Sequence, residues 1–115
     1  MRHPEETFVV QLLLPDGERT ITARADEHIW EAAFAQGVRL PALCHQGWCL
    51  TCAAHLEAPG EVDQSDSATY YPEDRAAGFV LLCTGRAASP LKLRTHQAIA
   101  MRKYRKQKKL PAPYS

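Results

Sequence analysis

Hydrophobic and polar positions near the start of the chain predict a β-hairpin. Residues 7–14 hold one Phe, two Val and three Leu with a single polar interruption at Gln11, which is typical of a strand. Pro15-Asp16-Gly17 is a turn signal, because proline presets φ and glycine accepts a positive φ. Residues 19–25 then alternate between polar and apolar side chains, which predicts the second strand of the hairpin.

A helix is predicted after the hairpin. Asp26 is the expected N-cap, and Gly37 is expected to end the helix as the residue after its C-cap. The aromatic and aliphatic side chains between them recur at helical spacing, so one face of the helix should pack inward. We expect four aromatic residues to lie in the core: Phe8, Trp30, Phe34 and Phe79.

The second half of the chain predicts shorter elements. Polar residues dominate 65–78, which indicates a loop with a short helix. Helix formers and charges fill 97–110, and two prolines follow them. Three further strands are expected from apolar or alternating runs: 53–57, 79–82 and 91–95.

Charge is distributed unevenly along the 115 residues. From Gln97 onward there are six basic residues and no acid, whereas residues 1–96 carry 8 Lys and Arg against 13 Asp and Glu, a net charge of −5. We therefore predict an acidic domain over residues 1–96 and a basic extension over residues 97–115. No apolar run is long enough for a membrane span and no signal-peptide pattern begins the chain, so we expect a cytoplasmic protein.

The four cysteines carry the candidate chemistry. Cys44, Cys49 and Cys52 give the spacing C-x4-C-x2-C, and Cys83 follows at a distance. Plant-type [2Fe–2S] sites use this spacing, since a short loop can supply three thiolates and a distant segment the fourth. A zinc site is the main alternative, although zinc more often uses two C-x2-C pairs, and two disulfides are a third.

Three stretches resemble plant-type (cyanobacterial and plastid) ferredoxins. They are the cysteine loop at residues 41–53, the Gly-Glu-Val-Asp-Gln-Ser-Asp run at residues 60–66 and the Ala-Gly-Phe-Val-Leu-Leu-Cys run at residues 77–83. The resemblance covers roughly residues 7 to 97. It implies an α+β, β-grasp fold, in which a mixed sheet is crossed by one main helix.

By this resemblance the chain is an electron-transfer protein and not an enzyme. It implies a [2Fe–2S] cluster held by Cys44 and Cys49 on the iron nearer the surface and by Cys52 and Cys83 on the other. The implied role is a one-electron shuttle from a reductase or photosystem I to soluble acceptor enzymes. We expect a monomer, and nucleic-acid binding is not expected, because the basic extension lacks interleaved aromatic residues.

The chain also departs from the family pattern. His45, Gln46, Trp48 and Leu50 stand where the cluster loop usually has arginine, small residues and serine. Leu50 cannot donate a hydrogen bond to cluster sulfur, whereas Thr51 still can, so we expect a shifted reduction potential. Trp48 could shield the cluster or admit electrons, and His45 could respond to pH or have no role.

The segment after Thr95-His96 lacks the family's acidic pair, which puts docking to the ordinary ferredoxin–NADP reductase in doubt. Two interpretations of the basic extension stay open: a solvated or partner-tuned segment, and a binding segment for an acidic partner, anionic lipid or nucleic acid. A second function from a different class also stays open. The chain could be a cluster-bearing sensor or assembly protein that binds a dedicated partner through this extension.

Overall fold

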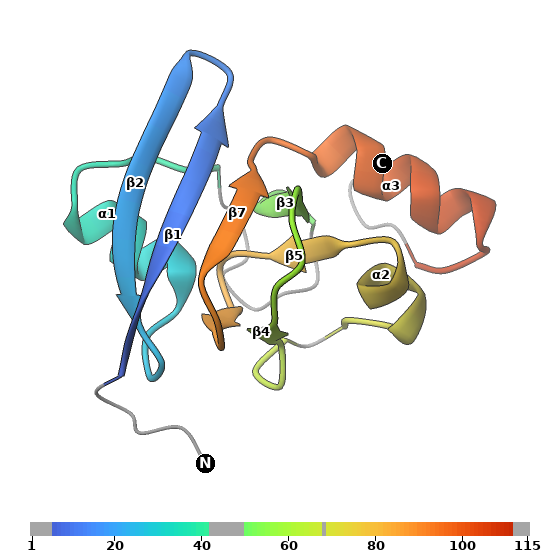
Figure 1. Cartoon of the computed structure of the whole chain (residues 1–115). Coiled ribbons are helices and arrows are strands. Elements are labelled where there is room, and N and C mark those ends of the chain that lie inside the picture. Colours follow the sequence, from blue (N-terminus) through green and yellow to red (C-terminus); the bar gives the residue numbers. More distant parts are fainter. Residues whose placement is uncertain (1–5, 42–49, 68, 112–115) are drawn as a thin grey trace.

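The chain folds around one mixed sheet of five strands (Figure 1). The computed structural model describes residues 6–41, 50–67 and 69–111. The strands lie in the order β2 (Gly17–Arg24), β1 (Thr7–Leu14), β7 (Leu91–Arg94), β3 (Ala53–Leu56) and β5 (Phe79–Leu81). The pair β1–β7 is parallel and the other pairs are antiparallel. The predicted strands are confirmed to within a residue or two at their ends.

The β1–β2 hairpin follows the predicted alternation of side chains. Val10 pairs with Ile21, and Leu14 pairs with Gly17 across the tight turn. Val10, Leu12, Ile21 and Ala23 are at most 2% exposed, whereas the residues between them face solvent. Because side chains alternate across a strand, this spacing sends one face of the hairpin into the core.

Helix α1 (Ile29–Ala35) packs against β2 and buries Ile29, Ala32 and Ala33. The predicted N-cap was wrong, because His28 occupies the N-cap position and the Asp26 carboxylate instead pairs with Arg24 at 3.0 Å. The predicted end was right, since Gly37 follows the C-cap with a φ of +84°.

The aromatic core was predicted with one error. Phe79 is buried, and both Phe8 and Trp30 are partly buried against the core. Phe34 is 57% exposed and stacks on the Trp30 ring with a centroid distance of 5.4 Å. Phe34 lies on the outer side of the helix, and the covered part of its ring packs on Trp30 and not on the sheet.

Smaller elements lie beside the five-stranded sheet. The strands β4 (Val62–Asp63) and β6 (Arg86–Ala87) form a separate antiparallel pair, which was not predicted. The helix α2 (Pro72–Ala76) lies beside β5, as expected for a short helix within residues 65–78. Tyr71 is the N-cap residue of α2, and the Asp74 carboxylate in the first turn accepts its backbone N–H at 2.9 Å.

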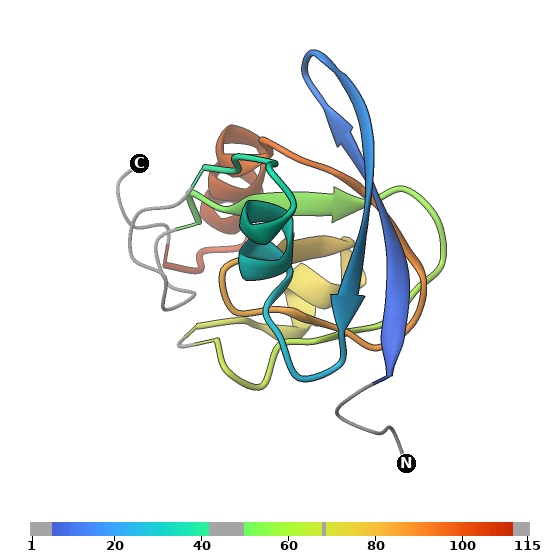
Figure 2. The same cartoon turned by 90° about the vertical axis from the view of Figure 1, so that its left-hand side faces the viewer.

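The basic segment forms helix α3 (Ala98–Gln107), which packs against β3 (Figures 1 and 2). Met101 and Arg105 are both 0% exposed, so the inner face of α3 belongs to the protein core. The interpretation of a solvated extension therefore holds for the outer face of the helix and is wrong for the inner one. The domain boundary at residue 96 stays a prediction.

In the described ranges, no helix has both the length and the apolar character that crossing a bilayer requires.

Candidate iron–sulfur site

The pairing of β3 with β5 brings Cys52 and Cys83 together. Ala53 at the start of β3 pairs with Leu81 at the end of β5, so the residues just outside these strand ends also meet. The Leu82 N–H donates to the Cys52 carbonyl at 3.3 Å. The Cys83 N–H donates to the Cys52 Sγ at 3.4 Å. Two cysteines that lie 31 positions apart in the sequence therefore share one buried place.

This arrangement fits two ligands of one metal centre. Cys52 and Cys83 are 2% and 3% exposed. A thiolate is the form that binds metal, and a buried anion needs hydrogen-bond donors. The backbone N–H at the Cys52 sulfur is such a donor, and bonds of this kind tune cluster ligands. The donor set therefore suits an iron–sulfur cluster, to which the chain would add thiolates, N–H groups and burial.

Gln64 fixes the strand that leads to Cys83. Its Oε1 accepts the Leu81 N–H at 2.7 Å, and its Nε2 donates to the Leu81 carbonyl at 3.3 Å and to the Ser67 Oγ at 2.9 Å. Gln64 is 5% exposed, so these bonds satisfy a buried amide that would otherwise be costly. The side chain thus extends the hydrogen bonding of β5 on the side opposite β3.

The turn after Cys83 is equally constrained. The Gly85 N–H donates to the Leu81 carbonyl at 2.8 Å, and the hydroxyls of Thr84 and Ser67 lie 2.6 Å apart. A Cβ on Gly85 would lie 2.9 Å from the Leu81 carbonyl oxygen, closer than real contacts allow. Cys83 therefore sits in a turn that its neighbours hold on both sides.

Sequence reasoning missed these supporting roles, although the Val-Asp-Gln-Ser run at residues 62–65 was part of the resemblance. The sequence signal for this role was weak, because Gln64 is an amide side chain with polar residues on both sides. The partner strand of Gln64 lies far away in sequence, so the bonds themselves could not be read from the chain.

Leu50 and Thr51 precede Cys52 in the described part of the loop. Leu50 is fully buried and has a φ of +65°, and its carbonyl accepts the Ala53 N–H at 3.0 Å. A leucine here adds apolar packing under the ligand segment. The Thr51 Oγ1 accepts from the Arg102 Nη2 of α3 at 3.4 Å. Because this bond uses an oxygen lone pair, the Thr51 hydroxyl can still donate its own proton.

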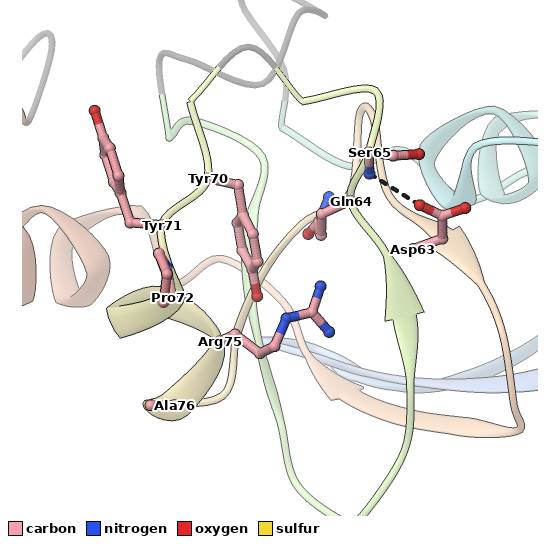
Figure 3. Close-up of a pocket in the computed structure, with 8 residues that line it drawn as sticks. All are labelled: Asp63, Gln64, Ser65, Tyr70, Tyr71, Pro72, Arg75 and Ala76. Carbon is pink, nitrogen blue, oxygen red and sulfur yellow. Dashed lines mark hydrogen bonds between the residues drawn. The ribbon is translucent and has the colours of Figure 1, made fainter.

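A surface hollow of about 530 Å³ adjoins the Gln64 segment and α2 (Figure 3). The Tyr70 ring lines it, and the Tyr70 hydroxyl donates to the Phe79 carbonyl at 2.5 Å. Burial raises the pKa of Tyr70 to about 12, so this phenol stays a neutral donor. The Tyr71 ring lies under the Arg105 guanidinium at 4.9 Å. Both tyrosines thus make packing contacts within the fold.

The rest of the predicted site lies outside the described residues. This applies to two of the four candidate ligands and to the loop residues between them: Cys44, His45, Gln46, Gly47, Trp48 and Cys49.

The fold and the paired cysteines define an iron–sulfur β-grasp domain. A family model described as the 2Fe-2S iron-sulfur cluster binding domain matches residues 13–88, and the chain belongs to this family. The cofactor is therefore a [2Fe–2S] cluster, and the predicted β-grasp fold is confirmed.

Relatives narrow the class to plant-type ferredoxins, as the resemblance predicted. The chain is 41% identical over 91 residues to Ferredoxin-2 of Synechococcus sp., which covers 79% of this chain and 86% of that protein. It is 39% identical to Ferredoxin-6, chloroplastic, of Zea mays, over 76% of this chain and 57% of the relative.

Similar domains also occur inside larger proteins. Pectocin M2 superimposes with a TM-score of 0.73 at 25% identity, over 89% of this chain and 40% of that one. The Amycolatopsis cytochrome P450 reductase GcoB gives a TM-score of 0.66 at 31% identity, over 76% of this chain and 25% of that chain. The chain thus spans less than half the length of these solved chains.

Proposed function

We propose that this chain is a one-electron carrier that holds its [2Fe–2S] cluster on Cys44, Cys49, Cys52 and Cys83. The observation that carries the proposal is the convergence of Cys52 and Cys83, where the Cys83 N–H donates to the Cys52 sulfur in a nearly water-free place. When bound, the cluster supplies a single-electron change at iron.

The described residues have distinct parts in this role. Cys52 and Cys83 would supply two of the thiolates that hold the cluster, and the Cys83 N–H would stabilise the thiolate charge of Cys52. Gln64 holds the backbone before Cys83, and the Ser67–Thr84 hydroxyl pair holds the backbone after it. Leu50, two positions before Cys52, adds buried apolar packing to the ligand segment. A carrier works best when its ligand geometry changes little on electron transfer, and this hydrogen-bonded support would keep such changes small.

We infer further that the chain acts as a monomer in the cytoplasm and carries out no substrate chemistry itself. Its electrons come from a reductase or photosystem I and pass to soluble acceptor enzymes. The relatives named ferredoxin support this role. One relative is a propane 2-monooxygenase reductase component from Mycolicibacterium goodii, of which the chain covers 19%, so the same domain also serves inside reductases.

The cluster is tested by chemical analysis and by a ligand variant. The purified protein should contain two irons and two acid-labile sulfides per chain and give the electron paramagnetic resonance signal of a reduced [2Fe–2S] cluster. Cys83→Ser should lose most of the cluster, whereas Thr84→Ser, which keeps a hydroxyl at the adjacent position, should retain it. Zinc without sulfide, or a Cys83→Ser protein with a full cluster, would contradict the ligand assignment.

Electron transfer is tested with cytochrome c as the acceptor. The chemically reduced protein should reduce cytochrome c in a single phase whose amplitude matches one electron per cluster. A stable cluster that fails to transfer electrons would exclude the carrier role and favour the sensor.

A further inference from the structure

The outer face of α3 gathers positive charge around one apolar side chain. Ile99 is 81% exposed. At helical spacing Arg102, Lys103 and Lys106 lie three, four and seven positions further on, so they share the face of Ile99. Lys103 and Lys106 are exposed, and Arg102 is half-buried. We call these four residues the basic face.

The basic face lies beside the ligand segment. The Gln97 N–H, just before α3, donates to the carbonyl of Ala53, the residue after Cys52. The Arg102 guanidinium donates to the Oγ1 of Thr51, the residue before Cys52. The start of α3 and its N-cap residue therefore contact the residues before and after Cys52 in the sequence, and a protein bound to the basic face would lie close to this ligand segment.

The lysines of α3 are not used within the fold. Across residues 6–41, 50–67 and 69–111, neither Lys103 nor Lys106 forms an ion pair, whereas Arg105 on the inner face is paired with Asp74. Positive charge that has no internal partner raises the local potential and attracts an oppositely charged surface.

We infer that the basic face is the docking site for an acidic redox protein, with Ile99 as its apolar contact. This rests on the proposed carrier function. An apolar residue with a charged rim is the usual anatomy of a small transient interface. The acidic body of residues 1–96 would repel the same partner elsewhere, so charge orients it with the ligand segment toward its own redox centre.

Two other occupants fit the structure less well. A helix that lies on lipid needs a broad apolar face, but the apolar side of α3 is already buried through Met101. Single-stranded nucleic acid needs exposed aromatic rings for stacking, and the Tyr104 ring instead packs on Phe79 with a centroid distance of 5.5 Å.

The test compares two haem acceptors of opposite charge by stopped flow, using the full chain with its cluster. The acidic probe is cytochrome b5 and the basic probe is cytochrome c. Transfer to cytochrome b5 should slow as salt rises. In Lys103→Glu/Lys106→Glu it should slow about tenfold or more at low salt, because steering changes rates by this order. Ile99→Ala should lower the rate a few-fold at every salt concentration.

The matched control is Arg19→Glu/Lys92→Glu, which reverses two exposed charges on β2 and β7 and should leave the cytochrome b5 rate within about twofold. Midpoint potentials of all variants are measured, so that a changed driving force is not mistaken for changed docking.

The docking site would be overturned if the charge-reversed control lost as much of the cytochrome b5 rate as Lys103→Glu/Lys106→Glu, or if that rate did not depend on salt. Either result would leave the carrier function standing. Failure of the unmodified protein to reduce either haem protein would overturn the carrier function as well. Binding to anionic lipid vesicles that needs Lys103 and Lys106, while the cytochrome b5 rate does not, would assign the face to a membrane instead.

Discussion

Arg105 ties α3 to the rest of the protein. Its guanidinium contacts both carboxylate oxygens of Asp74, at 3.2 Å and 2.8 Å, and donates to the carbonyls of Thr69 at 3.0 Å and Pro111 at 3.1 Å. Both charged side chains are 0% exposed. Such a pair contributes little compared with a well-packed apolar pair, but the removal of one partner leaves a buried charge without compensation.

Arg105→Met should therefore cost about 3–5 kcal/mol, the range measured when one member of a buried ion pair is removed. In this variant Asp74 keeps only the Tyr71 N–H among the bonds above. The cheapest response is for α3 to detach, because that exposes the carboxylate to water. At 1.4 kcal/mol per factor of ten, the detached form should become roughly 100- to 4,000-fold more populated.

Hydrogen exchange of the α3 backbone amides measures this population directly. Their protection should fall by that factor, while the amides of β1 and β2 keep theirs. Lys106→Met is the control, since it makes the same change on the exposed side of the helix and should alter protection less than about twofold. Asp74→Leu/Arg105→Met should recover most of the loss, because an apolar pair replaces the ionic one.

The reasoning would be refuted if Arg105→Met behaved like Lys106→Met. It would also be refuted if the double variant lost as much protection as the two single variants added together, since the cost would then not come from an unpaired charge.

Two further predictions concern buried polar groups near the site. Gln64→Leu leaves the Leu81 N–H without its acceptor at a cost of about 1–3 kcal/mol, whereas the Leu81 carbonyl still accepts the Gly85 N–H. The visible absorbance of the cluster should therefore bleach faster in denaturant than in Gln64→Glu, which keeps an acceptor, and equal rates would show that Gln64 does not hold this backbone. Burial raises the pKa of Tyr70 to about 12, so its phenol stays neutral in the folded protein. The contribution of Tyr70 to the free energy of unfolding is therefore complete below about pH 10 and is lost as pH rises toward 12. The tyrosinate absorbance that Tyr70→Phe removes should titrate near pH 12, and titration near 10 would show that the phenol is not buried.

Much of the sheet could be predicted because its strands carry period-two patterns that local sequence displays. The β1–β2 hairpin has both the alternation and a turn signal at Pro15-Asp16-Gly17. The strands β4 and β6 could not be predicted, since two residues are too few to show a period. The helix start was misplaced because Asp26 has a capping side chain but uses it on Arg24.

The site was predicted only in part, for a similar reason. Cysteine spacing indicated the cluster, and Cys52 and Cys83 do meet. The buried partner of Arg105 could not be inferred, because a basic residue among other basic residues looks like part of a solvated face. Its pairing depends on Asp74, which lies 31 positions earlier and is brought close only by the completed fold.

The position of β7 affects how the protein can be made. This strand follows the other four of the sheet in the sequence, yet it lies between β1 and β3 and joins the hairpin to the strands next to both buried cysteines. During synthesis the hairpin can form early, but the two halves of the sheet have no shared strand until residues 91–94 leave the ribosome. Such distant pairings form slowly. Insertion of iron and sulfide is therefore expected to follow the pairing of β7 with β1 and β3.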